Sequence, residues 1–355
     1  MAKAALAIKY RPHTFEDMTE QSAVKDILEN QIKTNSFQHG YLFTGPAGTG
    51  KTTSARIFAN MINDGKGNPI EVDAASNSGV DNIRQIIEDA KRKPLDAEYK
   101  IFIVDECHSL SNGAWQALLK TLEEPPKFTI FIFCTTDPQK IPNTILSRVQ
   151  RYNFQKISND GIVQRLEDIC VRENSQDYED PDLRDIGDIV HEKEALKYIA
   201  KVCNGGMRDA ITLLDKCLSL SHDITLENVL KTIGAEDYST FFDFLDQLCR
   251  KDKMSIAIID KVYNSGKDVK QFLKDFSKFI LDVEKYMVYQ SIDYIQIPTT
   301  QENLGKLLGF KAVTKEVYDV MDFIVSLNSQ IKWDSDPRTL IELSILIYCG
   351  RSDVV

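Results

Sequence analysis

The chain has 355 residues, of which 43% are hydrophobic and 27% are charged, and its formal net charge at pH 7 is −10. This length predicts two or three globular domains, no apolar run is long enough to cross a membrane, and the N-terminal apolar patch is too short for a signal peptide. The acidic balance argues against a protein that wraps nucleic acid over its whole surface, although it permits a local basic lining.

The first 155 residues alternate short apolar strands with helical patterns. Runs of β-branched or aromatic residues predict strands at 41–44, 70–73, 101–105, 128–135 and 151–154. Apolar residues at helical spacing mark helices at 21–32 and 79–90. Because the strands are apolar almost throughout, this alternation predicts a parallel sheet with helices on both faces.

After about residue 157 the strand patterns stop, and only helical patterns follow. They lie at 191–202, 207–220, 237–250 and 267–286. A glycine-containing break at 233–239 divides this region into a smaller and a larger bundle. The acidic segment 174–188, which contains proline and glycine, is predicted to be a solvated surface loop.

A phosphate-binding motif follows the strand at 41–44. The segment GPAGTGKTT matches G-x-x-x-x-G-K-[ST] and lies between a strand and an amphipathic helix, as such a loop requires. Lys51 would reach the β- and γ-phosphates, and Thr52 would place its hydroxyl on Mg²⁺. A glycine-rich turn that merely contains a lysine is the less favoured alternative. The candidate nucleotide ligands are Gly45, Pro46, Ala47, Gly48, Thr49, Gly50, Lys51, Thr52 and Thr53.

The strand at 101–105 ends in the pair Asp105-Glu106. A carboxylate at the end of the strand beside the phosphate-loop strand can hold Mg²⁺, and a second one next to it can polarise the attacking water. An Asp-Glu pair is also typical of an ordinary solvated turn. Its combination with the phosphate loop favours the catalytic interpretation.

Three other positions are candidates for contact with phosphates. The strand at 128–135 runs into Thr135-Thr136, where a hydroxyl could face the γ-phosphate or the attacking water. Arg148 ends a short helical stretch, and Arg208 begins a helix, from which it could report the nucleotide state to another domain. For both arginines the alternative is a structural ion pair.

Seven segments then point to one family: KYRPHTFEDM, GPAGTGKT, EVDAASNSGVDNIRQI, VDECHSLS, ALLKTLEEPP, TTDPQKIPNTILSR and NGGMRDA. Over residues 3–217 the chain resembles the gamma/tau subunits of the bacterial DNA polymerase III clamp loader, which are AAA+ ATPases. The resemblance implies an α/β P-loop AAA+ domain at 1–157, with a parallel sheet flanked by helices. A small helical lid domain with the second sensor would follow at 158–235, and an all-α collar domain for oligomerisation at 236–355.

The resemblance also implies roles for matching residues. Lys51 and Thr52 would serve the phosphates and Mg²⁺, Asp105 would hold the metal, and Glu106 would activate the water. Thr136 would be the first sensor. The remaining implied residues are Arg208 as the second sensor, Arg148 as an arginine finger that reaches the ATP of a neighbouring subunit, and Tyr10, Arg11 and Pro12 as lining of the adenine pocket.

The implied function is that of an ATP hydrolase without polymerase chemistry of its own. ATP binding would order a pentameric arc of subunits that opens a sliding clamp and grips primer–template DNA, and hydrolysis would release the closed clamp. The expected partners are the other loader subunits, the clamp and primed DNA, with single-strand-binding protein as a further candidate. Ser78 and Arg84 are candidate contacts to DNA phosphates, although Arg84 could equally lie on a solvated helix face.

The chain departs from the family pattern in three ways. The short segment 63–69 stands where the family carries a four-cysteine zinc module, and the seven cysteines have no C-x-x-C spacing, so we expect buried free thiols and no zinc. Val149 replaces the cysteine of a Ser-Arg-Cys motif but leaves the arginine in place. The chain ends soon after the collar region, which predicts a gamma-length, cytoplasmic protein without the tau tail.

Two other classes of protein remain as alternatives. Another AAA+ DNA motor, such as a branch-migration or recombination-associated ATPase, would share the phosphate loop and both sensors but not LLKTLEEPP or TTDPQKIPNTILSR. A non-hydrolysing structural subunit would be expected to lose Lys51 or Glu106, and this chain keeps both. The clamp-loader motor is therefore the leading hypothesis.

Overall fold

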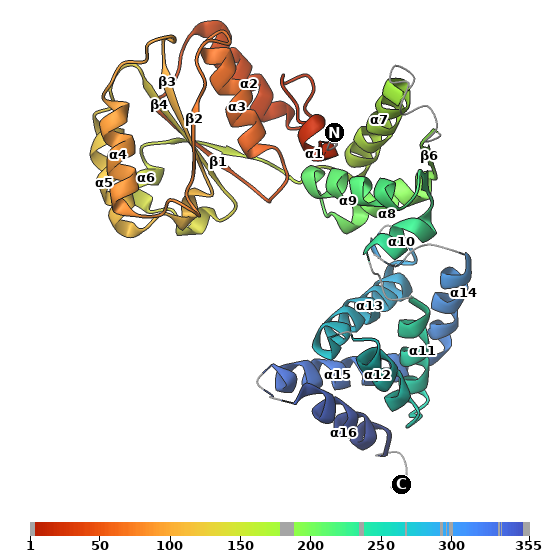
Figure 1. Cartoon of the computed structure of the whole chain (residues 1–355). Helices are drawn as coiled ribbons and strands as arrows, with labels where there is room; N and C mark the ends of the chain where they lie inside the picture. Colours follow the sequence, from red (N-terminus) through yellow and green to blue (C-terminus); the bar gives the residue numbers. More distant parts are fainter. Residues whose placement is uncertain are drawn as a thin grey trace. The chain divides into compact units, whose positions relative to one another are not determined.

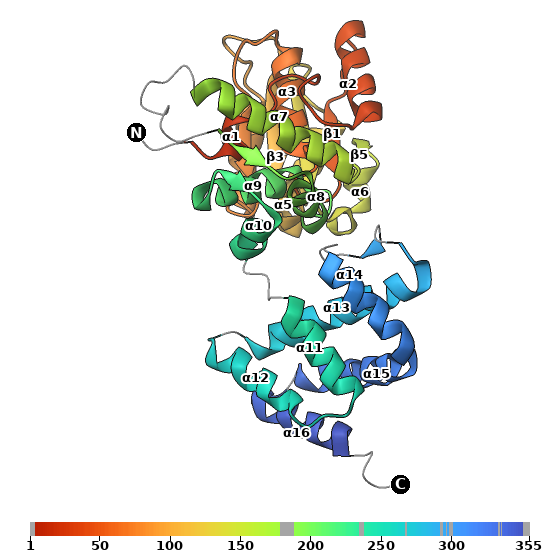
Figure 2. The ribbon, with the colours of Figure 1, turned by 90° about the vertical axis from the view of Figure 1, so that its right-hand side faces the viewer.

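The computed structural model describes residues 4–177, 188–233, 238–266, 268–291, 294–295, 297, 301–332, 334 and 336–350. The chain forms two compact units, which we call the first unit (Met1–Thr232) and the second unit (Ile233–Val355). Figures 1 and 2 show the ribbon from two directions. The finer division into three domains stays a prediction.

A five-stranded parallel sheet, in the order β2-β3-β4-β1-β5, forms the centre of the first unit. All five predicted strands are confirmed to within one residue at each end. The expectation that the Asp105 strand lies directly beside the phosphate-loop strand was wrong, because β4 lies between β1 and β3. The strands are β1 (Gly40–Thr44), β2 (Ile70–Asp73), β3 (Lys100–Asp105), β4 (Thr129–Thr135) and β5 (Gln150–Asn153).

Helices cover both faces of this sheet (Figure 1). Successive residues of a strand face opposite sides, so Tyr41 packs with Phe58 in one core and Leu42 with Trp115 in the other. The first core involves α2 and α3, and the second involves α4, α5 and α6. These elements, with two 3₁₀ turns, are α2 (Ser22–Thr34), α3 (Lys51–Ile62), α4 (Val80–Ala90), η1 (Cys107–Ser109), α5 (Asn112–Glu123), η2 (Pro138–Lys140) and α6 (Asn143–Leu146).

The rest of the first unit is mainly helical and includes a short parallel strand pair, β6 and β7, which the sequence patterns did not predict. Residues 174–177 belong to α7, so the predicted loop at 174–188 was partly wrong, and 178–187 lie outside the described residues. Asn174 fixes this helix end, since its side chain exchanges hydrogen bonds with the backbone of Ile189 (2.7 and 3.1 Å). These elements are α7 (Asn159–Asp177), β6 (Val190–His191), α8 (Lys193–Val202), α9 (Met207–Leu220), β7 (Asp223–Ile224) and α10 (Leu226–Ile233).

The N-terminal helix α1 (Leu6–Lys9) attaches the start of the chain to two of these helices. On α7, the buried Glu173 carboxylate accepts hydrogen bonds from Lys9 Nζ (2.5 Å) and from the Tyr10 hydroxyl (2.6 Å). On α9, Asp215 accepts a hydrogen bond from the backbone N–H of Leu6 (3.0 Å). The segment that leads to Arg11 and Pro12 is therefore held against the helical part of the first unit.

We expect Tyr10→Phe to lower the free energy of unfolding by roughly 1–3 kcal/mol, the cost of losing a buried hydrogen bond to a charged group. Burial, together with the bond to Glu173, also raises the pKa of the Tyr10 hydroxyl, so this group keeps its proton and donates the hydrogen bond throughout the neutral range. Urea unfolding followed by circular dichroism measures the change. Tyr289→Phe removes an exposed hydroxyl and is the control; equal stability of both variants would show that the Glu173 contact does not stabilise the fold.

The second unit is helical in its described parts. Its core is rich in phenylalanine from α11 and α13, where Phe244 and Phe276 lie with ring centroids 4.7 Å apart. In the described parts of both units, no helix combines the length and apolarity needed to cross a membrane. The elements are α11 (Tyr238–Cys249), α12 (Ser255–Asn264), α13 (Val269–Tyr289), α14 (Gln301–Gly309), η4 (Phe310–Val313), α15 (Thr314–Ile331) and α16 (Pro337–Gly350).

Candidate nucleotide site

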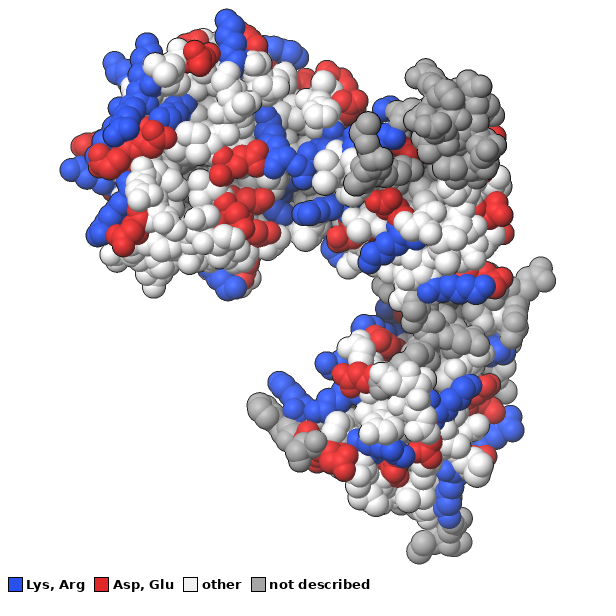
Figure 3. All heavy atoms as spheres, in the orientation of Figure 1, with Lys and Arg blue, Asp and Glu red and all other residues white. Residues whose placement is uncertain are grey.

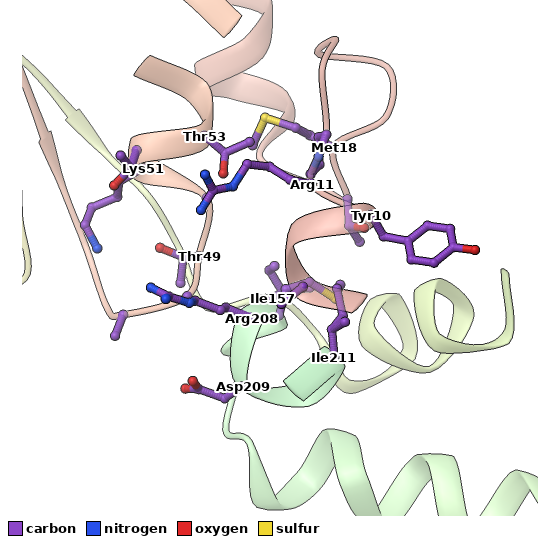
Figure 4. Close-up of a pocket in the computed structure, with 18 of the residues that line it drawn as sticks. Tyr10, Arg11, Met18, Thr49, Lys51, Thr53, Ile157, Arg208, Asp209 and Ile211 are labelled. Carbon is purple, nitrogen blue, oxygen red and sulfur yellow. The ribbon is translucent and has the colours of Figure 1, made fainter. Parts of the chain in front are cut away.

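A cavity of about 270 Å³ lies in the first unit, at the carboxyl ends of the parallel strands (Figure 4). Parallel sheets place ligands at this edge, because the loops that follow the strands meet there. The lining includes residues 47–53 of the phosphate loop, Asp105, Glu106, Arg208 and the N-terminal segment 10–12. The fold thus brings most of the predicted site residues together from four separate parts of the chain.

The phosphate loop turns sharply between β1 and α3. Gly45 has a φ of +144°, and a Cβ added to it would lie 2.3 Å from the carbonyl oxygen of Phe154, so only glycine fits there. Helix α3 begins at Lys51 directly after the loop, and Gly50 before it supplies no side-chain cap. The first N–H groups of α3 are therefore available to an anion at the cavity.

Lys51 lies inside the loop, with 6% of its surface exposed. Its ammonium donates hydrogen bonds to the carbonyl oxygens of Gly45 (2.9 Å) and Pro46 (2.7 Å). Burial lowers the pKa of this ammonium, and the carboxylates of Glu106 and Asp105 act in the opposite direction. A phosphate would offer Lys51 charged acceptors, which form stronger hydrogen bonds than neutral carbonyls do.

Thr52, on α3, and Asp105, at the end of β3, are in contact although β4 separates β3 from β1, the strand that precedes α3. Thr52 Oγ1 donates a hydrogen bond to Asp105 Oδ2 at 2.8 Å, because α3 packs across β3 as well as β1. A hydroxyl and a carboxylate oxygen are hard ligands of the kind that Mg²⁺ prefers, with waters and phosphate oxygens completing its shell. The residues present therefore fit a Mg²⁺ ion.

Glu106 adopts a left-handed backbone conformation with a φ of +46°, unusual for a residue other than glycine. Its carboxylate accepts a hydrogen bond from Thr136 Oγ1 (3.1 Å) and lies 3.2 Å from His108 Nδ1, which is also 3.1 Å from Thr135 Oγ1. Sequence analysis missed His108. The 3₁₀ turn Cys107–Ser109 folds it back toward Glu106, and its position two residues after a catalytic candidate was the available signal.

Two arginines approach the cavity in addition to Lys51. Figure 4 shows the side chains of Arg11 and Arg208 extending toward the phosphate loop from different elements. Among the described residues, neither guanidinium has a hydrogen-bond or ion-pair partner. The pKa of Arg11 is lowered, mainly by burial and to a smaller extent by the like charges of Arg56 and Arg208. Tyr10 is part of the cavity lining, but its ring points away from the cavity and its hydroxyl donates a hydrogen bond to Glu173. With Arg165, which also lines the cavity, four basic residues surround it and favour a polyanionic ligand.

Arg148 does not line this cavity. Its guanidinium donates hydrogen bonds to Glu123 Oε1 (2.5 Å) and to the carbonyl oxygen of Thr144 (2.5 Å), both on the same chain. Within one chain, Arg148 therefore makes the surface ion pair that the alternative interpretation predicted.

The candidate DNA contacts also lie outside the cavity. Arg84 pairs with Asp81 at 3.0 Å on the exposed side of α4, and the carbonyl of Ser78 accepts a hydrogen bond from the Ser111 N–H (3.1 Å). Figure 3 shows Lys and Arg side chains gathered at the edge of the first unit where α4 and α5 lie, interspersed with acidic ones. The net negative charge of the chain is thus compatible with a locally basic edge.

The strand order, the phosphate loop after β1, the acidic pair after β3 and the arginine on α9 define a P-loop protein of the AAA+ ATPase class. Residues 70–158 match the family model described as DNA polymerase III, delta subunit, and residues 183–223 match the one described as the ATPase lid domain of a DNA polymerase III clamp loader subunit. Over most of its length, the chain is similar to proteins named as DNA polymerase III gamma/tau subunits.

Three relatives illustrate the similarity. The chain is 34% identical to DNA polymerase III subunit tau of Bacillus subtilis, over 99% of this chain and 64% of that protein. It is 33% identical to subunit gamma/tau of Mycoplasma genitalium, over 85% and 52%, and 29% identical to subunit gamma of Buchnera aphidicola, over 78% and 80%. The chain thus spans about half to two-thirds of the length of the first two relatives.

Solved structures of more distant proteins are also similar. The Thermotoga maritima RuvB Holliday junction branch migration motor is 20% identical, over 73% of this chain and 86% of that chain, with a TM-score of 0.48. At this distance the likeness assigns no activity to the chain.

Proposed function

We propose that this chain is the ATPase motor subunit of a replication clamp loader, which uses ATP binding and hydrolysis to load a sliding clamp onto primed DNA. The observation that carries the proposal is the meeting of the phosphate loop, the acidic pair and Arg208 around one cavity, in a chain similar to gamma/tau subunits. Such a cavity has the groups for phosphoryl transfer to water, a reaction that depends on positioning and charge stabilisation.

The proposed division of labour within the cavity follows from the contacts. Lys51 and the first N–H groups of α3 would bind phosphate oxygens, and Thr52 with Asp105 would hold Mg²⁺, which supplies further neutralisation of the phosphate charge. Glu106 would polarise the attacking water, while Thr136 holds its carboxylate at the strand edge. Lys51, Thr52, Asp105 and Glu106 all line the cavity in which they would have these roles.

Three further roles depend on other parts of the assembly or of the chain. Arg208 would contact the terminal phosphate from α9, and Arg11 and Pro12 would lie beside the base and sugar. Arg148 would contact the nucleotide bound to a neighbouring subunit. This role is consistent with its place outside the cavity of its own chain. Hydrolysis would then require assembly.

The proposed partners are other clamp-loader subunits in a pentameric assembly, a sliding clamp and primer–template DNA. DNA would be held through its phosphates, which needs only local positive charge and backbone N–H groups. Ser78 and Arg84, at the start of α4, are the proposed contacts on this chain.

Steady-state ATP hydrolysis by the chain with its cognate loader subunits tests this function. We expect stimulation of about tenfold, within the usual range of allosteric coupling, only when both the clamp and a primed junction are present. Stimulation by duplex or branched DNA without any clamp would instead indicate another AAA+ DNA motor. No hydrolysis under any of these conditions would indicate a structural subunit.

A further inference from the structure

A direct backbone contact joins the phosphate loop to the helix that carries Arg208. A Cβ added to Gly48, in the middle of the loop, would lie 3.0 Å from the Cα and 3.3 Å from the carbonyl carbon of Gly206. The N–H of Met207, the first residue of α9, donates a hydrogen bond to the Gly48 carbonyl oxygen at 3.0 Å. Since a helix leaves its first N–H groups without internal partners, the phosphate loop supplies a cap for α9.

The same short segment is held from its other side. Gly205 has a φ of +89°, and a Cβ added to it would lie 2.6 Å from the Cβ of Lys156, in the connection between β5 and α7. The Ile157 N–H donates a hydrogen bond to the Gly205 carbonyl (3.2 Å), and Lys156 Nζ donates one to the Asn204 side chain (2.8 Å). The segment before α9 is thus confined between this connection and the phosphate loop.

From these contacts we infer that Gly206 is a positioning residue, which seats the start of α9 on the phosphate loop and thereby places Arg208 at the terminal phosphate of the nucleotide. The inference rests on the proposed nucleotide-binding function of the cavity. Arg208 lies in the first turn of α9, two residues after Gly206, so a shift of the helix start moves it by a similar distance.

Gly206 is required here for its size and not for its backbone conformation. Its dihedral angles (φ −93°, ψ 100°) are extended and open to any L-residue. A Cβ at this position would lie 3.0 Å from Asp209 Oδ2, 3.3 Å from the Cys203 carbonyl oxygen and 3.5 Å from the Ala47 carbonyl oxygen of the loop. Alanine would crowd these atoms slightly, and valine would push α9 away from the loop.

The test is equilibrium binding of fluorescent ATP and ADP analogues to the full chain. We expect Gly206→Val and Arg208→Ala each to weaken ATP binding about tenfold to a hundredfold, the range of a hydrogen bond to a charged group, while ADP binding changes little. The double variant should be no weaker than Arg208→Ala alone, since both changes remove the same contact. Gly79→Val is the matched control: Gly79 also precedes a helix with extended dihedral angles (φ −76°, ψ 153°), and its added Cβ would meet nothing within 4 Å.

The outcomes separate the inference from the proposed function. Equal losses of ATP and ADP affinity in Gly206→Val, with Arg208→Ala still losing ATP alone, would overturn the positioning role and leave the proposed function intact. A wild-type chain that binds neither nucleotide would contradict both. If circular dichroism shows Gly206→Val to be unfolded, the ATP and ADP affinities of the milder variant Gly206→Ala are compared instead. A wild-type ratio of ATP to ADP affinity in Gly206→Ala would then overturn the inference.

Discussion

Replacement of Lys51 by alanine should lower the rate of ATP hydrolysis by a factor on the order of 100 to 1,000, the usual effect of removing a charge-stabilising donor from a catalytic site. Lys51 is the cation that lies within the phosphate loop, where its burial removes competing water. The loop carbonyls of Gly45 and Pro46 hold its ammonium at the cavity, so the group is already placed for a phosphate. Its removal should also weaken nucleotide binding.

Release of inorganic phosphate at steady state and equilibrium binding of an ATP analogue measure these two effects separately. Lys91→Ala is the matched control, because Lys91 is an exposed lysine of the same unit that pairs with Glu88 at 2.6 Å. Exposed pairs of this kind contribute little, so the control should hydrolyse ATP at the wild-type rate. Hydrolysis by Lys51→Ala at the rate of the control would show that this cavity is not the hydrolytic site.

The strands and the phosphate loop were predictable because each is encoded by neighbouring residues. Strands buried on both faces leave continuous apolar runs, and the loop glycines precede a helix directly. The order of the strands is different in kind, because it depends on contacts between segments far apart in the chain. The insertion of β4 between β1 and β3 therefore escaped sequence analysis, as did the end of α7, which Asn174 fixes through Ile189.

The candidate site was predicted as a set of residues, without the contacts that join them. The sequence pattern indicated Glu106 and Thr136 separately, whereas their hydrogen bond and the approach of His108 depend on a 3₁₀ turn and a left-handed residue. Likewise Gly205 and Gly206 occur in the segment NGGMRDA, but only their packing against Lys156 and the phosphate loop explains why glycine is needed there. Side chains placed by long-range packing carry no periodic pattern in the sequence.

Replacement of Arg148 by alanine should lower ATP hydrolysis by the assembled loader by roughly 10³- to 10⁵-fold, the range measured for arginine fingers. ATP binding by the chain itself should stay unchanged, because Arg148 lies outside its own cavity and pairs with Glu123. Glu123→Gln is the control, since it removes the partner and keeps the arginine. An exposed ion pair of this kind contributes about 0–1 kcal/mol, so this variant should stay within a few-fold of the wild-type rate.

Mixing two inactive variants distinguishes a finger that acts between subunits from one that acts within its own chain. A Lys51→Ala subunit keeps Arg148, and an Arg148→Ala subunit keeps an intact cavity. If Arg148 serves a neighbour, an assembly that contains both should regain hydrolysis at those sites where a normal cavity adjoins a normal arginine. If the mixture stays as inactive as either variant alone, or if Arg148→Ala hydrolyses ATP at the wild-type rate, Arg148 does not act across the subunit boundary, and its pair with Glu123 is then a structural contact of the surface.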